Sequence, residues 1–113
     1  MPVIEIKEFE KYKEQGYKGT FVGGCVERGD GSSFRAKAHA HIDKRDIFQG
    51  WICVRSMKRV FMKDGRPSKL MIHELAHILT RSGHDGKWAL KVRELGGHVN
   101  KQYKRFKEVA KVL

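Results

Sequence analysis

The fold of this chain is decided by the stretch Met71-Ile72-His73-Glu74-Leu75-Ala76-His77-Ile78-Leu79. Apolar side chains recur around its two histidines at the spacing of a helix, which predicts an amphipathic α-helix. The preceding Pro67-Ser68 is a typical helix start, with Ser68 as the expected N-cap. The histidines are four residues apart, so both imidazoles are expected on one face of the helix.

That spacing allows His73 and His77 to bind one zinc ion, with each nitrogen about 2.0–2.1 Å from the metal. Glu74 follows the first histidine and points away from the ligand direction. It can therefore reach a water held by the metal without binding the metal itself, which is where a general base must be. The H-E-x-x-H pattern is the signature of zinc metallopeptidases. The alternative is a structural helix that carries two incidental histidines.

A catalytic zinc needs three protein ligands and a position left for water. His84 is the preferred third ligand because it follows Gly83, where the helix is expected to end and the chain can fold back over it. The other candidates for the third ligand are Glu94, Asp85 and His98.

Around this helix, the patterns predict strands at 20–28, 33–42 and 51–54, and helices within 3–15, 86–95 and 100–112. In 33–42 the residues alternate, and one face carries Arg35, Lys37, His39 and His41. This face is either a solvated strand face or a surface that contacts phosphate or lines a cleft. A second metal on His39 and His41 is only weakly indicated by two histidines at this spacing.

The chain has 113 residues, of which 40% are hydrophobic, so residues 1–113 are expected to form one domain. It contains no run of 18 apolar residues, and its first residues carry acidic side chains where a signal peptide is apolar. A cytoplasmic, intracellular protein is therefore expected. The two cysteines, Cys25 and Cys53, fit buried thiols in a reducing compartment, although a disulfide stays open.

The formal net charge is +11, which favours an acidic partner such as nucleic acid over a neutral one. The alternative is a basic solvated surface without such a partner. The nucleic-acid interpretation assigns phosphate contacts to the densest basic groups, which include Arg35, Lys37, Lys104, Arg105 and Lys107.

The run His73-Glu74-Leu75-Ala76-His77, followed by Gly83-His84-Asp85-Gly86-Lys87-Trp88, resembles the small zincin metalloproteases of the SprT and WLM type. The resemblance covers residues 68–97, and the residues that match the part after the helix are His84, Asp85 and Trp88. It implies an α+β, minimal zincin-like fold, in which a small, mainly antiparallel sheet packs against the H-E-x-x-H helix and further helices. It also implies proteolysis near DNA.

We therefore expect a zinc-dependent metallopeptidase of protein or peptide substrates, in which His73, His77 and His84 hold Zn²⁺ and Glu74 is the base. Candidates for stabilising the oxyanion are Tyr103, His98, His39 and Arg81. Two alternatives stay open. One is a nucleic-acid-binding module with a structural zinc, and the other is a metallohydrolase of a non-protein amide, such as a cell-wall enzyme.

Overall fold

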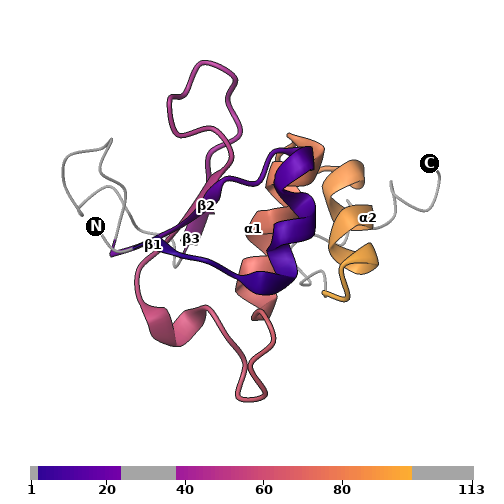
Figure 1. Cartoon of the computed structure of the whole chain (residues 1–113). Coiled ribbons are helices and arrows are strands. Elements are labelled where there is room, and N and C mark those ends of the chain that lie inside the picture. The colour runs from indigo at the N-terminus through magenta and orange to yellow at the C-terminus, as the bar shows by residue number, and fades with distance from the viewer. Residues whose placement is uncertain (1–2, 24–37, 98–113) are drawn as a thin grey trace.

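The computed structural model describes residues 3–23 and 38–97, and in this part of the chain the fold is α+β. A sheet lies on one side, and the helices at Lys7–Gln15, Lys69–Thr80 and Gly86–Glu94 gather on the other (Figure 1). The strands are β1 (Val3–Ile4), β2 (Gly19–Val22), β3 (Ala38–Ala40) and β4 (Trp51–Val54). The helices are the 3-10 helices η1 (Lys7–Gln15) and η4 (Met57–Arg59) and the α-helices α1 (Lys69–Thr80) and α2 (Gly86–Glu94).

The sheet is mixed, with strand order β1-β2-β4-β3. Its outer pairs, β1 with β2 and β3 with β4, are antiparallel, whereas the central strands β2 and β4 are parallel. The expectation of a mainly antiparallel sheet thus needs correction at its centre. The physical reason is the long connection from 23 to 50, which contains β3 and brings the chain back to start β4 in the direction of β2.

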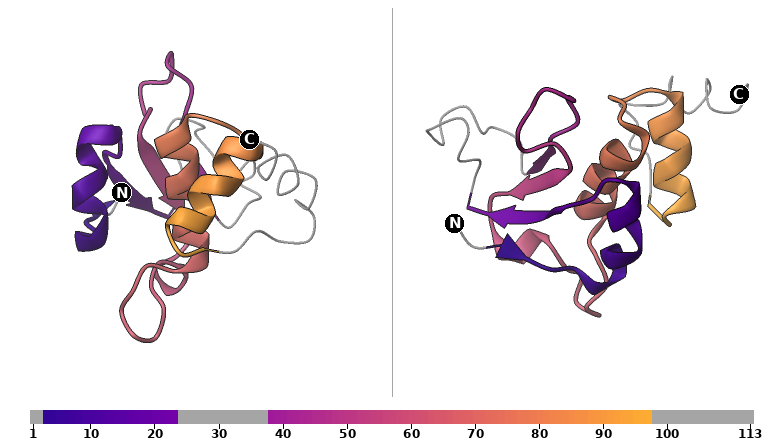
Figure 2. Two further views of the ribbon diagram at one scale, coloured as in Figure 1. Left: turned by 90° about the vertical axis from the view of Figure 1, so that its right-hand side faces the viewer. Right: turned by 45° about the horizontal axis from the view of Figure 1, so that its top comes forward.

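The helix α1 lies between the sheet and α2, as both views in Figure 2 show. Its apolar side packs on the sheet, where Leu75 and Ile78 share one buried core with Ile52 and Val54 of β4. A second, smaller core joins α1 to α2 through Ala76, Trp88, Ala89 and Val92. Among the described residues, no helix is long and apolar enough to cross a membrane.

The strand β4 confirms the prediction of an inner strand at 51–54, since Ile52, Cys53 and Val54 are fully buried. Its partner β3 shows the predicted alternation: Ala38 belongs to the core beneath α1, whereas His39 faces the other side of the sheet. Of the two alternatives for the other face, a solvated face does not apply to His41, which is only 5% exposed. The segment after it folds back, and Phe48 packs at 5.8 Å from its ring.

The predicted start of α1 is confirmed, because Ser68 caps it by accepting a hydrogen bond from the backbone N–H of Met71 at 3.2 Å. Gly16 ends η1 in the left-handed conformation. The prediction that Gly83 ends α1 was wrong, because the left-handed residue is Arg81, at φ 54°. The predicted helix at 100–112 lies outside the described residues.

Candidate metal centre

The helix α1 presents His73 and His77 on the side that faces α2. The sequence folds this way because the apolar side of α1 is used by the sheet, and the smaller core with Trp88 takes the side beside the histidines. The two imidazole rings lie 5.0 Å apart, one turn from each other. Helical spacing thus places both rings at the junction of α1 and α2.

The loop between the helices brings the third histidine back to this junction. Arg81 reverses the chain, and the carbonyl oxygen of Ser82 accepts a hydrogen bond of 2.7 Å from Nδ1 of His77. Asp85 then caps α2 by accepting from the backbone N–H of Trp88 at 2.9 Å. His84 lies between Ser82 and Asp85 in the chain, so the hydrogen bonds of these two neighbours fix its position.

The structure brings the three histidines together at their Nε2 atoms. The Nε2 atom of His84 lies 3.0 Å from that of His73 and 3.2 Å from that of His77. Two nitrogens bound to one tetrahedral zinc at about 2.0–2.1 Å are separated by roughly 3.3 Å. A proton on one ring can form a hydrogen bond between two of these nitrogens. Three nitrogens that face one another are better suited to binding a cation. The residues therefore fit a metal ion.

The local environment keeps these rings neutral, which is the form that binds metal. Burial lowers the pKa of His73 to about 3, with a smaller effect from the neighbouring His77 and His84. Burial likewise lowers the pKa of His77 to about 4, although its bond to the Ser82 carbonyl acts in the opposite direction. The pKa of His84 is also lowered by burial. At neutral pH, protons would therefore not compete with a metal ion for these ring nitrogens.

Glu74 lies beside this cluster and is not among the three side chains that could hold a metal ion. Its carboxylate Oε2 is 4.0 Å from Nε2 of His73, and the residue is only 5% exposed. In the metal-free protein, burial raises the pKa of Glu74 to about 8. A divalent cation nearby would favour the ionised form and lower this pKa again. In the metal-free protein, this carboxyl group therefore keeps its proton at neutral pH.

Trp88 is a positioning residue that connects the three histidines. Its indole Nε1–H donates to the backbone carbonyl of His73 at 3.1 Å. Its ring is stacked on His77 and meets His73 and His84 edge-on, with centroids 4.7–5.2 Å apart. Because Trp88 is fully buried, it holds all three imidazoles against a rigid surface.

The other predicted ligands do not join this cluster in the described part of the chain. Glu94 is exposed and forms an ion pair with Lys91 at 2.7 Å, and the side chain of Asp85 caps α2. His98 lies outside the described residues. Of the groups considered for the oxyanion, His39 lies in a separate cluster and Arg81 is exposed, whereas Tyr103 and His98 are not described.

The basic residues expected to contact nucleic acid all lie outside the described residues: Arg35, Lys37, Lys104, Arg105 and Lys107. A cavity of about 330 Å³ lies beside η1, α1 and α2, where Phe9, Tyr12 and Ile72 are among its lining residues. None of the three histidines lines it, so we assign it no part in the chemistry of the metal centre.

Two functional groups were missed by reasoning from the sequence. The Ser82 carbonyl could not be found from residue identity, because any residue supplies a carbonyl. Trp88 was predicted on the apolar side of the helix at 86–95 and as a match to the resembled family, but neither pattern indicated its contact with the histidines. No family model, curated protein or solved structure matches this chain.

Proposed function

We propose that this protein is a zinc metallopeptidase of the small zincin type, with His73, His77 and His84 as the metal ligands. One observation carries the proposal: the Nε2 atom of His84 lies 3.0 Å from that of His73 and 3.2 Å from that of His77, with a buried carboxyl group beside the three rings. Within residues 3–23 and 38–97 the cluster has three ligating side chains, the number that is typical of catalytic zinc.

Zinc bound there would supply Lewis acidity, by lowering the pKa of a water molecule and polarising the carbonyl of a peptide bond. Glu74 would accept a proton from the attacking water and deliver it to the leaving amine nitrogen. Its position supports this role, because Oε2 of Glu74 lies 4.0 Å from Nε2 of His73 and the carboxylate is not among the side chains that would hold the metal. His77 would be held in one tautomer by the Ser82 carbonyl, which leaves its Nε2 for the metal.

The substrate class is part of the same proposal. A formal net charge of +11 supports substrates that are bound to nucleic acid, because the protein would be attracted to the phosphate backbone. A metallopeptidase that binds nucleic acid through its basic residues would cleave proteins that are associated with the nucleic acid.

The test compares Glu74→Gln with Glu94→Gln, since Glu94 is an exposed glutamate on α2 and serves as a matched control. An unfolded, fluorescently labelled protein is the substrate, and zinc content is measured by mass spectrometry. We expect Glu74→Gln to lose roughly 10²–10⁴-fold in the rate of hydrolysis with its zinc content unchanged. The control should retain both.

Loss of zinc in Glu74→Gln would make Glu74 a ligand, and full activity would remove its role as base. Cleavage of cell-wall fragments by the wild type, without cleavage of any protein substrate, would replace the peptidase proposal by an amidase. Four protein ligands in the X-ray absorption spectrum of the zinc protein would favour a structural site.

A further inference from the structure

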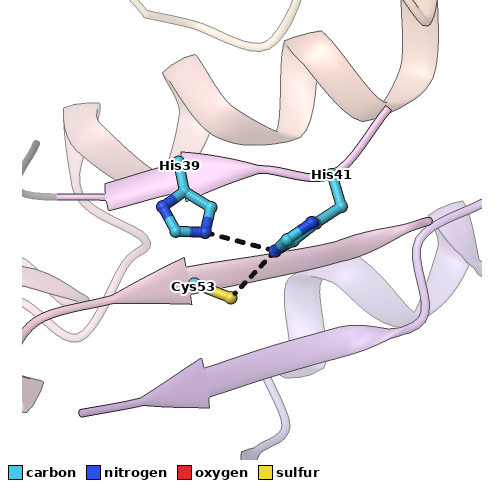
Figure 3. A group of neighbouring side chains, drawn as sticks. All are labelled: His39, His41 and Cys53. Atoms are coloured by element: carbon cyan, nitrogen blue, oxygen red, sulfur yellow. Dashed lines mark hydrogen bonds between the residues drawn. The ribbon is translucent and has the colours of Figure 1, made fainter. Parts of the chain in front are cut away.

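A second group of metal-binding side chains lies on the sheet, separate from the α1 histidines. His39, His41 and Cys53 point toward one another from β3, the segment after it and β4 (Figure 3). The Nε2 atom of His41 is 3.2 Å from Nε2 of His39 and 3.4 Å from Sγ of Cys53. These three atoms all lie within 4.8 Å of one another.

The sheet itself brings them together. His39 is paired directly with Cys53 in the antiparallel register of β3 and β4, so their side chains project from the same face. The pairing continues past β3, because the backbone N–H of His41 donates to the carbonyl of Trp51 at 3.0 Å. His41 is two residues beyond His39 and therefore shares that face. This is the face away from α1, since Ile52 and Val54 on the other face pack in the core with α1.

A carboxylate sets the tautomer of His41. Asp46 Oδ2 accepts a hydrogen bond of 2.6 Å from Nδ1 of His41, which leaves Nε2 of that ring as a lone-pair donor directed at the other two side chains. Asp46 is itself fixed, because its other oxygen accepts from the backbone N–H of Phe48 at 2.8 Å. A carboxylate behind a histidine is the arrangement that orients metal-binding imidazoles in proteins.

The distances fit a small tetrahedral metal. With Zn–N of about 2.0–2.1 Å and Zn–S of about 2.3 Å, bound nitrogens are separated by roughly 3.3 Å, and a nitrogen and a sulfur by roughly 3.5 Å. The observed 3.2 and 3.4 Å are close to these values. Two imidazoles and a thiolate are a ligand set that favours zinc over magnesium or calcium.

The same atoms could be considered as a cysteine nucleophile with a histidine and an aspartate. That chemistry requires a sulfur that a substrate can reach. Cys53 is fully buried, and His41 is 5% exposed. Burial disfavours attack on a substrate and suits a metal that stays in place.

We propose that His39, His41 and Cys53 supply three ligands of a second zinc site, on the face of the sheet away from α1. Bound metal would join β3 to β4 and hold the segment 41–50 against the sheet. The site shares no residue with His73, His77 and His84, so it stands whether or not those residues form a catalytic centre.

The test uses the full chain, stripped of metal with a chelator and titrated with Co²⁺, which replaces zinc in tetrahedral sites. We expect two cobalt ions per chain and a near-ultraviolet charge-transfer band, which arises from sulfur bound to cobalt. Cys53→Ser should lose the band and one equivalent of cobalt.

His73→Ala with His77→Ala should also keep the band, because the sheet site does not depend on α1. A band that persists in Cys53→Ser, or a wild type that binds one cobalt without any such band, would overturn the proposal. Rapid alkylation of Cys53 by iodoacetamide in the metal-treated protein would overturn it as well, since it would show an accessible thiol.

A second pair of variants leaves the three ligands intact. Asp46→Asn removes the carboxylate behind His41, and Asp43→Asn is its control, because Asp43 is exposed and contacts Arg45. We expect the cobalt affinity of the thiolate site to fall about 10–100-fold in Asp46→Asn and to stay unchanged in the control. Equal affinities in the two variants would contradict the proposed ligand role of His41.

Discussion

The buried carboxyl group of Glu74 makes a quantitative prediction about the metal-free protein. Its pKa is raised from 4.5 to about 8 in the folded state, so the folded protein keeps a proton that the unfolded chain releases. The free energy of unfolding should therefore fall as the pH rises from 4.5 towards 8. Each pH unit in this range costs about 1.4 kcal/mol while the folded state stays protonated.

The perturbation is Glu74→Gln, which keeps the shape of the side chain and removes its titration. Histidines titrate in the same pH range, but their contributions cancel in the difference between the two proteins. Between pH 6 and pH 8, the variant should gain about 2 kcal/mol over the wild type, since the folded carboxyl group is half ionised at the upper limit.

The assay is urea denaturation at pH 6 and pH 8 with excess chelator, and Glu94→Gln is the control whose difference from wild type should not change with pH. Adding zinc should abolish the effect, because a divalent cation beside the carboxylate stabilises its ionised form. A difference between Glu74→Gln and wild type that is the same at both pH values would refute the reasoning that burial controls this group.

Three further outcomes are expected. Trp88→Phe loses the hydrogen bond to the His73 carbonyl and should bind zinc about 10–100-fold more weakly, as measured by competition with a chelator. Unchanged zinc affinity would show that Trp88 does not position the histidines. Ser68→Ala should lower the free energy of unfolding by about 1 kcal/mol in urea denaturation, unless the cap is dispensable. DNA affinity should fall by about 0.9 log unit per log unit of salt for each duplex phosphate neutralised. Replacing Lys104, Arg105 and Lys107 with glutamine should flatten this slope and leave the zinc content unchanged. No binding at low salt would remove the nucleic-acid part of the proposal.

Much of the α1 region could be predicted from the sequence because its signals are local. The spacing of His73 and His77 fixes their shared face, and the caps Ser68 and Asp85 act within three residues of their partners. The end of α1 was misplaced because glycine is only the commonest residue in the left-handed conformation, and Arg81 adopts it two residues earlier. The approach of His84 to both histidines depended on this turn.

The sheet was less predictable because its pairings join distant parts of the chain. Nothing in the strand at 51–54 indicates that it pairs in parallel with β2 and antiparallel with β3. The side-chain cluster on its outer face depends on that register, which brings Cys53 opposite His39. From the sequence, only His39 and His41, two residues apart, indicated a metal site here. That evidence is weak without Cys53 and Asp46, which the fold brings beside them.

The alternation of alanine and histidine in β3 makes this strand intolerant of insertions and deletions. Adding or removing one residue within 38–41 would exchange the two faces, so that imidazoles met the core beneath α1 and small methyl groups replaced the histidines on the outer face. The exposed residues Asp43, Lys44 and Arg45 lie in a connection that can change length without altering the strand pairing. Homologous chains should therefore keep a constant spacing from Ala38 to His41, whereas a change in length after Ile42 would move Asp46 relative to His41 and leave the strand pairing in place.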